Sequence, residues 1–270
     1  MIKASPFNEA SIPANPAITI LPGDPLTVLT ANLKNPYFAT GRVEKGMVLT
    51  RLEAFARLAE AERADVLLCQ EVGRGRDFRV DEWLSDRLGL AGVYARANGS
   101  AACLGREEGL AIFSRYPLVE QRVTLLAGGL WRRPALGAVA STPWGEVALY
   151  TTHHSLRPWR NRVEPGRLYR WVEATAGSGP AIIGGDFNAG EDAPQMRALS
   201  RAWVDAFRAA NPSAAGPTHD LRLFGRVFRR RLDYLFLKCR ALELRVVSAS
   251  VRDASFSDHR AVVARLMASR

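Results

Sequence analysis

Short apolar runs that end in a polar or ionisable residue recur along the 270-residue chain, and this pattern constrains its fold most. Between the runs lie segments with the spacing of amphipathic helices. If the runs are strands lying side by side in one sheet system, their polar ends meet at one edge, where α/β proteins place their sites. These polar residues are Asn32, Glu71, His153, Asp186 and Asn188, and near the C-terminus Asp233, Asp258 and His259. The sequence therefore predicts an α/β protein with one polar site.

Strands and helices are expected to alternate from Leu26 onward. The expected strands are Leu26–Ala31, Asp65–Cys69, Gly109–Ser114, Gly145–Thr152, Pro180–Gly184, Leu232–Lys238 and His259–Leu266. The expected helices are Val48–Arg63, Leu168–Ala176 and Ala193–Ala202. The segments Arg96–Glu108 and Asn211–Asp220 are rich in Gly, Ser or Ala, so we expect them to be mobile loops at the rim of the site.

Prolines divide the chain into an arm and a single domain. The first 25 residues contain five of the chain's 15 prolines, so we predict a flexible arm over residues 1–25 and one domain over residues 26–270. No stretch approaches the roughly 20 apolar residues of a membrane span, and the arm has no continuous apolar segment. We therefore predict a cytoplasmic protein without membrane insertion. Three cysteines without CxxC spacing argue against a disulfide framework and a cysteine-rich zinc site.

The chain is strongly basic, with a formal net charge of +10 and a pI of about 10.1. Such an excess favours a polyanionic partner, either nucleic acid or an anionic membrane surface. The positive charge is almost all arginine, and the chain is also rich in alanine, a pairing that a GC-rich genome produces without selection for binding. Charge alone leaves both interpretations open.

The residue types at the strand ends favour one class of chemistry. Carboxylates and an amide are hard oxygen ligands, which suit Mg²⁺ or Mn²⁺ better than zinc. Two histidines and a further aspartate can activate a water and stabilise a phosphorane-like transition state. The sequence contains no serine nucleophile elbow, P-loop or GxGxxG motif. The set therefore favours metal-assisted hydrolysis of a phosphoester by water.

The individual residues differ in how strongly they indicate function. Taken alone, Glu71 has the alternative of a surface acid and Asn32 that of a turn residue. The segment Gly184–Asn188 is more specific, because two glycines allow close backbone approach and the Asp and Asn two positions apart point the same way. We predict that His154 and His219, unlike His153 and His259, are surface or loop residues.

Seven ordered motifs between Leu26 and Leu266 resemble the endonuclease/exonuclease/phosphatase superfamily, the fold of DNase I and of the apurinic-site endonucleases. They are TANL with Asn32, CQEV with Glu71, GLAIFSRYPL, TTHHS with His153, GGDFNAG with Asp186 and Asn188, RLDYLF with Asp233, and FSDHRAVV with Asp258 and His259. The resemblance implies a four-layer α/β sandwich, with two packed mixed β-sheets flanked by helices.

The resemblance also implies a role for each motif residue. Glu71, with Asn32 and Asp258 close by, would hold Mg²⁺ or Mn²⁺. Asp186 and Asn188 would position the attacking water and the phosphate. His259, held by Asp233, would act as a base or as a cationic hydrogen-bond donor, because a carboxylate partner fixes the imidazole tautomer and raises its pKa. His153 would stabilise charge on the phosphate oxygens.

Two departures separate the chain from the apurinic-site endonucleases. Lys34 stands where they carry an aspartate two residues after the first Asn, and Arg230 stands where they carry a tryptophan before the RLDY motif. The chain is more similar to the mixed branch of general nucleases, sphingomyelinase-like enzymes and inositol-phosphate phosphatases.

Arginines near the motifs suggest how a substrate is held. Arg132 follows Trp131, and Arg157 and Arg160 surround Trp159, a mixture that suits phosphate contacts and base stacking, although the tryptophans have the alternative of packing residues. The candidate substrate-binding residues are Arg132, Arg157, Arg160 and Arg230. We predict a monomeric DNA-directed nuclease or DNA-end-processing phosphodiesterase. A lipid or small-molecule phosphoesterase is the alternative, and the complete set of acids and histidines argues against a catalytically silent binding module.

Overall fold

Alternate residues of each central strand face two different apolar cores, which requires a layer of structure on both sides of the sheet. The computed structural model describes residues 24–35, 45–223, 225–238, 244–253 and 255–268. In the first strand, Val28 packs between two sheets and Leu29 packs toward helices. In the other sheet, Ile182 and Ile183 divide in the same way. The predicted arm over residues 1–25 lies almost entirely outside the described residues.

Two mixed six-stranded sheets form the centre of the molecule. The first sheet has the order β13 (Leu244–Arg252), β14 (Ala261–Ala268), β1 (Leu26–Asn32), β2 (Val66–Gly75), β4 (Arg106–Ser114) and β3 (Ala91–Ser100). The second has the order β5 (Leu118–Ala127), β6 (Arg133–Thr142), β7 (Gly145–His153), β8 (Ala181–Asp186), β12 (Asp233–Lys238) and β9 (Val204–Asp205). The pairs β1–β2 and β7–β8 are parallel, and the other pairs are antiparallel.

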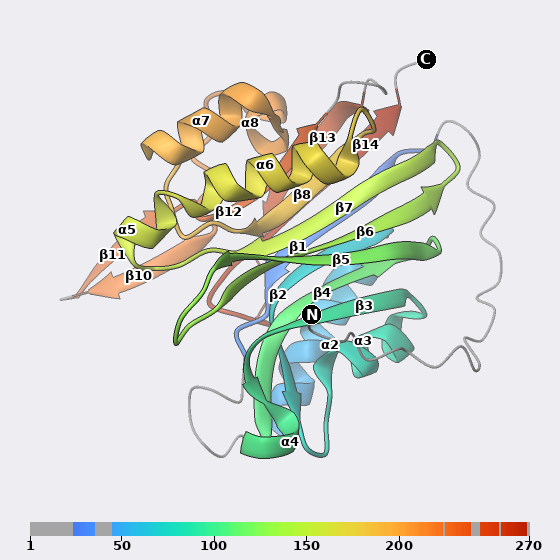
Figure 1. Cartoon of the computed structure of the whole chain (residues 1–270), viewed down its shortest axis with the longest axis vertical. Helices are drawn as coiled ribbons and strands as arrows, with labels where there is room; N and C mark the ends of the chain where they lie inside the picture. Colours follow the sequence, from blue (N-terminus) through green and yellow to red (C-terminus); the bar gives the residue numbers. More distant parts are fainter. Residues whose placement is uncertain (1–23, 36–44, 224, 239–243, 254, 269–270) are drawn as a thin grey trace.

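Helices cover the outer face of each sheet (Figure 1). The helices α2 (Lys45–Ala61) and α3 (Val80–Leu88) lie on the first sheet, and α6 (Glu164–Ala176) and α7 (Pro194–Ala202) lie on the second. The short helices are α4 (Ala101–Leu104), α5 (Pro158–Asn161) and α8 (Ala206–Ala210). Three apolar cores therefore separate four layers, and the predicted four-layer α/β sandwich is confirmed. Among the described helices, none is both long and apolar enough to cross a membrane.

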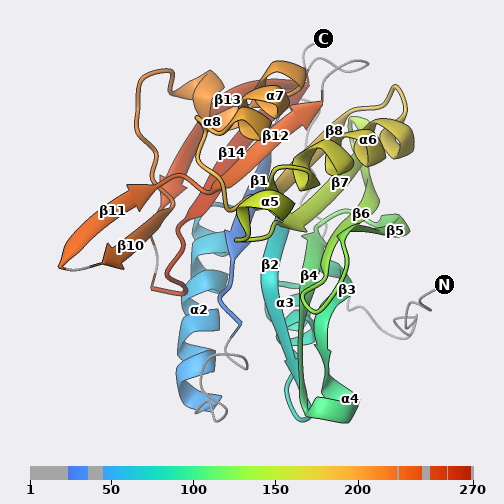
Figure 2. The same cartoon turned by 60° about the vertical axis from the view of Figure 1, so that its left-hand side comes forward.

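A two-stranded hairpin of β10 (His219–Leu223) and β11 (Arg226–Arg230) projects from this body (Figure 2). The expectation of mobile loops is wrong over Arg96–Glu108, because this segment forms the end of β3, the helix α4 and the start of β4. The expected loop Asn211–Asp220 is irregular up to Thr218 and then begins the hairpin.

The glycines before Asp186 lie inside strand β8, where the neighbouring chain comes too close for a side chain. A Cβ at Gly185 would lie 2.3 Å from the carbonyl oxygen of Thr152 on the adjacent strand, and one at Gly184 would lie 2.7 Å from Leu68 of the other sheet. A Cβ at Gly190, four residues beyond Asp186, would meet no heavy atom within 4 Å, so this glycine serves as a control.

We expect Gly185→Ala to lower the free energy of unfolding by about 1–3 kcal/mol or more, because backbone atoms must move to admit the methyl group. Gly190→Ala should leave it nearly unchanged. Urea unfolding followed by circular dichroism measures both. Equal midpoints for the two variants would contradict the close approach of β7 and β8.

Candidate active site

Three adjacent strands of the second sheet place polar side chains in one row. His153 ends β7, Asp186 ends β8, and Asp233 begins β12, with His153 opposite Asp186 and Asp186 opposite Asp233 in the register. All three side chains are buried or nearly so. The predicted convergence of strand ends is therefore present in this sheet, and its cause is the alignment of the apolar runs that precede each residue.

The first sheet contributes Asn32 and Glu71 to the same edge. Strand β2 contains a bulge in which Gln70 and Glu71 lie opposite one residue of β4, and Glu71 has φ of 52°. A bulge re-aims side chains: Gln70 points between the sheets and donates to Thr151 Oγ1 at 2.9 Å, whereas Glu71 accepts from Asn32 Nδ2 at 3.0 Å. Positive φ in a non-glycine residue is costly and concentrates at functional sites.

Asn32 joins the two sheets. Its Nδ2 also donates to Asp186 Oδ2 at 3.1 Å, and its Oδ1 accepts from the backbone N–H of Lys34 at 2.9 Å. These contacts fix the orientation of the amide between Glu71 and Asp186. The side chains of Asn32, Glu71 and Asp186 thus form one continuous hydrogen-bonded cluster.

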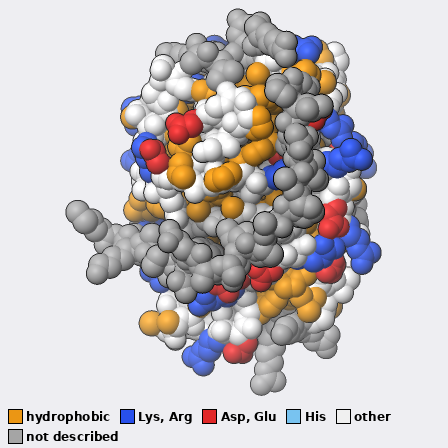
Figure 3. Space-filling model, turned by 90° about the vertical axis from the view of Figure 1, so that its right-hand side faces the viewer, with side chains coloured by type: hydrophobic (Ala, Val, Ile, Leu, Met, Phe, Trp, Pro, Cys, Tyr) orange, Lys and Arg blue, Asp and Glu red, His pale blue; other side chains and the backbone are white. Residues whose placement is uncertain are grey.

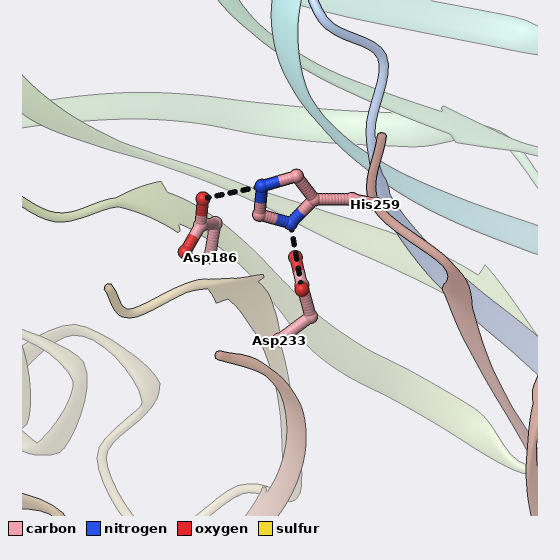
Figure 4. A group of neighbouring side chains, drawn as sticks. All are labelled: Asp186, Asp233 and His259. Carbon is pink, nitrogen blue, oxygen red and sulfur yellow. Dashed lines mark hydrogen bonds and ion pairs between the residues drawn. The ribbon is translucent and has the colours of Figure 1, made fainter. Parts of the chain in front are cut away.

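His259 lies between two carboxylates (Figure 4). Its Nδ1 is 2.9 Å from Asp233 Oδ2, and its Nε2 is 3.8 Å from Asp186 Oδ2. Burial favours the neutral ring, but the charge of Asp233, the hydrogen bond to it and the charge of Asp186 outweigh burial and raise the pKa of His259 to about 9. At neutral pH the imidazole is therefore cationic, and its Nε2–H points toward Asp186.

The carboxyl group of Asp186 is destabilised as an anion. Burial, followed by repulsion from Asp233, raises the pKa of Asp186 to about 7. The backbone N–H of Asn188 donates to its Oδ1 at 2.8 Å. Asn188 itself has φ of 48°, and its side chain donates to the carbonyl of His154 at 2.9 Å. A carboxyl poised near neutral pH can exchange a proton with a reacting group.

His153 also lies beside Asp186, but its charge state differs from that of His259. Its Nε2 is 3.6 Å from Asp186 Oδ2, and its Nδ1 is 3.4 Å from an Nη1 of Arg133. Burial, then the Arg133 cation, holds the pKa of His153 well below its ordinary value. His153 is therefore a neutral ring, whereas His259 is a cation.

Asp258 lies at the exposed side of the cluster. Its Oδ2 accepts from Lys34 Nζ at 2.8 Å, with about half of both side chains exposed. Burial opposes the effect, but the Lys34 ammonium lowers the pKa of Asp258. The lysine that departs from the apurinic-endonuclease pattern thus pairs with a residue that the resemblance assigns to the metal.

Two arrangements of described residues could hold a cation. The first is the predicted oxygen set, in which Asn32 is hydrogen-bonded to Glu71 and Asp258 is paired with Lys34. In the second, one ligand atom each from Asp186, Asp233 and His259 lies within 4.8 Å of the others. That second arrangement conflicts with the hydrogen bond between His259 and Asp233, which a cation there would have to displace. In the oxygen set the pair to be displaced is the exposed one between Lys34 and Asp258, and oxygen ligands suit a hard cation better.

The predictions for two histidines are wrong. His154, expected at the surface or in a loop, directly follows β7 but is fully buried and packs edge-on against Phe187 at 4.7 Å, and burial with Arg133 lowers its pKa to about 3. His219, expected in a surface loop, is half-buried in β10, with its ring 4.6 Å from the ring of His259. Cross-strand neighbours of this kind carry no local sequence signal.

The four candidate substrate-binding arginines have different surroundings. Arg160 donates to the carbonyls of Gly128 and Trp131 at 2.6 and 3.1 Å and so braces that loop. The Arg157 guanidinium is exposed and lies 5.6 Å from the Trp159 ring. Arg132 is half-buried, and Arg230 is exposed on the hairpin. Arg133, next to Arg132, is the arginine that contacts His153, and it is absent from the residues predicted from sequence.

The family match agrees with this geometry. Residues 31–259 match the Endonuclease/Exonuclease/phosphatase family, a span that begins just before Asn32 and ends at His259. The chain belongs to this family. Its members are hydrolases of phosphoester bonds, so the predicted superfamily is confirmed together with its general chemistry. A comparison with curated proteins finds no match.

Solved structures share the fold of this endonuclease/exonuclease/phosphatase protein. A family protein from Leptotrichia buccalis is 18% identical with a TM-score of 0.73, covering 89% of this chain and 99% of its own. The human Nocturnin catalytic domain with bound sulfate is 20% identical with a TM-score of 0.71, covering 91% and 95%. A mannosyl-6-phosphatase from Bacteroides thetaiotaomicron is 17% identical with a TM-score of 0.69, covering 90% and 99%.

Proposed function

We propose that this protein is a monomeric, divalent-metal-dependent phosphodiester hydrolase that acts on DNA. One observation carries the proposal. Hydrogen-bond donors from both sheets converge on one carboxylate oxygen: Asn32 Nδ2, His153 Nε2 and His259 Nε2 lie 3.1, 3.6 and 3.8 Å from Asp186 Oδ2. Such preorganised donors around a base stabilise an oxyanion that develops beside it.

The two histidines and Asp186 have separate roles in this proposal. His259 acts as a cationic donor to a phosphate oxygen, because its pKa of about 9 keeps it protonated at neutral pH. Asp186, oriented by Asn188, accepts the proton of the attacking water. His153 donates from Nε2 to a second phosphate oxygen, since Arg133 faces its Nδ1 and leaves that nitrogen as an acceptor.

The residues that would hold Mg²⁺ or Mn²⁺ are Glu71, Asn32 and Asp258. The carboxylate of Glu71 is held by Asn32 Nδ2 and by the backbone N–H of Asn35, both at 3.0 Å, so its orientation is fixed by neighbours. A cation bound there would act as a Lewis acid on the phosphate oxygens. Lys34 would have to leave Asp258 if that carboxylate joins the ligand set.

We expect Glu71→Gln to raise the Mn²⁺ concentration for half-maximal binding about tenfold or more, because the amide lacks the negative charge of the ligand. Manganese binding measured by electron paramagnetic resonance gives this value independently of turnover. Glu146→Gln, an exposed acid at the start of β7, is the matched control and should bind as wild type does. Equal binding by all three proteins would reject Glu71 as a ligand.

The exposed Arg230 and Phe228 of the hairpin, which is bridged to His259, support DNA as the substrate. The similarity to a mannosyl-6-phosphatase supports a small phosphorylated molecule as the second candidate. On the side opposite the hairpin, described acidic side chains lie among the basic ones, so that face is not a continuous basic surface (Figure 3). The described residues of that face therefore do not form a basic surface that would account for the net positive charge of the chain.

A substrate panel separates the candidates. The purified protein is assayed with Mg²⁺ or Mn²⁺ on single-stranded DNA, plasmid, abasic duplex, sphingomyelin, sugar phosphates and bis-p-nitrophenyl phosphate. The proposal expects cleavage of DNA and of the phosphodiester, with steep loss of DNA binding as salt rises. Activity restricted to lipid or to phosphomonoesters would reject DNA as the substrate.

A further inference from the structure

The hairpin of β10 and β11 extends the active-site row outward. His219 of β10 is bridged to His259 on one side and paired with Arg230 of β11 on the other. Residues directly opposite one another in antiparallel strands project on the same face. His259, His219 and Arg230 therefore form one cross-strand row, and the ring contact of His219 with His259 at 4.6 Å agrees with this register.

The alternation of side chains then assigns each described hairpin residue to a face. The site-side face comprises His219, Leu221, Arg226, Phe228 and Arg230. The far face comprises Asp220, Val227 and Arg229. Asp220 and Arg260, each one residue along from the bridged His219 and His259 and so on the far face, form a bidentate pair at 2.9 Å for each contact, which supports the assignment.

The two faces differ in charge. On the far face, Asp220 pairs with Arg260 and is also influenced by Arg229, and these cations lower its pKa. Among its described residues, the site-side face has no acid. There, Phe228, 47% exposed, stands between Arg226 and Arg230 along the strand, and all five residues of β11 are exposed. A nucleic acid strand likewise alternates flat apolar bases with phosphates.

We propose that the site-side face of the hairpin binds an unpaired nucleic acid strand next to the scissile phosphate, with a base stacked on Phe228 and phosphates paired with Arg226 and Arg230. The inference rests on the proposed function, because it extends the same site. A stacked base must be unpaired, so the geometry selects single strands or frayed ends over intact duplex.

A membrane surface fits the hairpin less well than a nucleic acid strand does. Three of the five residues of β11 are arginines, including Arg226 beside the turn. Insertion of the tip into a bilayer would bring these charges toward hydrocarbon, at high cost. On the site-side face, Phe228 lies opposite the exposed Leu221, but Arg226 and Arg230 flank Phe228 along the strand, and Val227 lies on the other face.

The test compares two residues of equal exposure on opposite faces. Phe228 and Val227 are each 47% exposed. Binding of a fluorescein-labelled oligothymidylate is measured by anisotropy in EDTA, so that the strand stays intact. We expect Phe228→Ala to raise Kd about fivefold or more, Phe228→Trp to restore binding, and Val227→Ala to bind as wild type does. Arg230→Gln should flatten the salt dependence more than Arg229→Gln.

Three outcomes would overturn the inference: failure of the wild type to bind the oligonucleotide, equal binding by Phe228→Ala and Val227→Ala, or an effect of Phe228→Ala confined to phosphatidylserine vesicles. Hydrolysis of bis-p-nitrophenyl phosphate is measured in parallel and should be equal in the wild type and in the two far-face variants, Val227→Ala and Arg229→Gln. If the wild type does not hydrolyse this phosphodiester but Phe228→Ala still binds the oligonucleotide more weakly than Val227→Ala does, the proposed hydrolase is rejected and the hairpin site stands.

Discussion

Asp186→Asn should reduce turnover of bis-p-nitrophenyl phosphate by about 1000-fold or more, because the base that accepts the water proton is lost. The same change should leave the protein as stable as wild type or more stable. Burial and Asp233 raise the pKa of Asp186 to about 7, so its ionised form is less favourable in the folded protein than in the unfolded chain.

The sign of the stability effect follows from that shift. The folded state holds the proton more tightly than the unfolded state, so the cost of ionising Asp186 appears as pH rises from its ordinary value of 3.8 toward about 7 and persists above it. Replacement by a neutral amide removes this cost. Thermal unfolding at pH 8 is the measurement. Asp186→Glu keeps the charge and should be inactive because its carboxylate is misplaced, and wild-type turnover in Asp186→Asn would reject Asp186 as the base.

Asp233→Asn should reduce turnover by about 100-fold or more and move the alkaline limit of activity to lower pH. Asp233 makes the largest contribution that raises the pKa of His259 to about 9. In the wild type the cationic ring is present below that pH and is lost above it, so activity should decline as pH rises through about 9. Without Asp233, the limit should move toward the ordinary histidine value of 6.5.

Proton NMR of the imidazole resonances reports the same shift without turnover. The control is Asp220→Asn, which removes a carboxylate from the hairpin but keeps the hydrogen bond between Asp233 and His259. An alkaline limit that stays in place in Asp233→Asn would contradict the cationic role of His259. Activity that rises through pH 9 in the wild type would instead favour His259 as a general base.

The central strands are predictable from sequence because both of their faces are buried. Strand β8 is apolar up to Gly184 and buried throughout, and the polar residue that follows it marks the end of the run. The edge strand β5 is not among the predicted strands, since Val119 and Val123 are exposed and the run Leu118–Ala127 shows no apolar stretch that stands out. Tertiary pairing decides such strands.

Composition misleads the prediction where contacts are long-range. The segment Arg96–Glu108 has the residues of a loop, but the Oδ1 of Asn98 accepts from the backbone N–H of Arg132, distant in the sequence, at 2.8 Å. The expected site residues come from strand ends and motifs. Arg133 reaches His153 from the paired strand β6, and His219 reaches His259 through an isolated bridge from the hairpin; no local pattern encodes either contact.

The central claim is that a divalent cation at Glu71 faces a phosphate held by His153 and His259, with Asp186 beside it as the base. Anomalous diffraction from crystals grown with Mn²⁺ and phosphate tests it most directly. We expect a manganese peak within coordination distance of the Glu71 carboxylate and a phosphate in contact with Nε2 of both histidines. A manganese peak between Asp233 and His259, or full occupancy at a site remote from Glu71, would contradict the account.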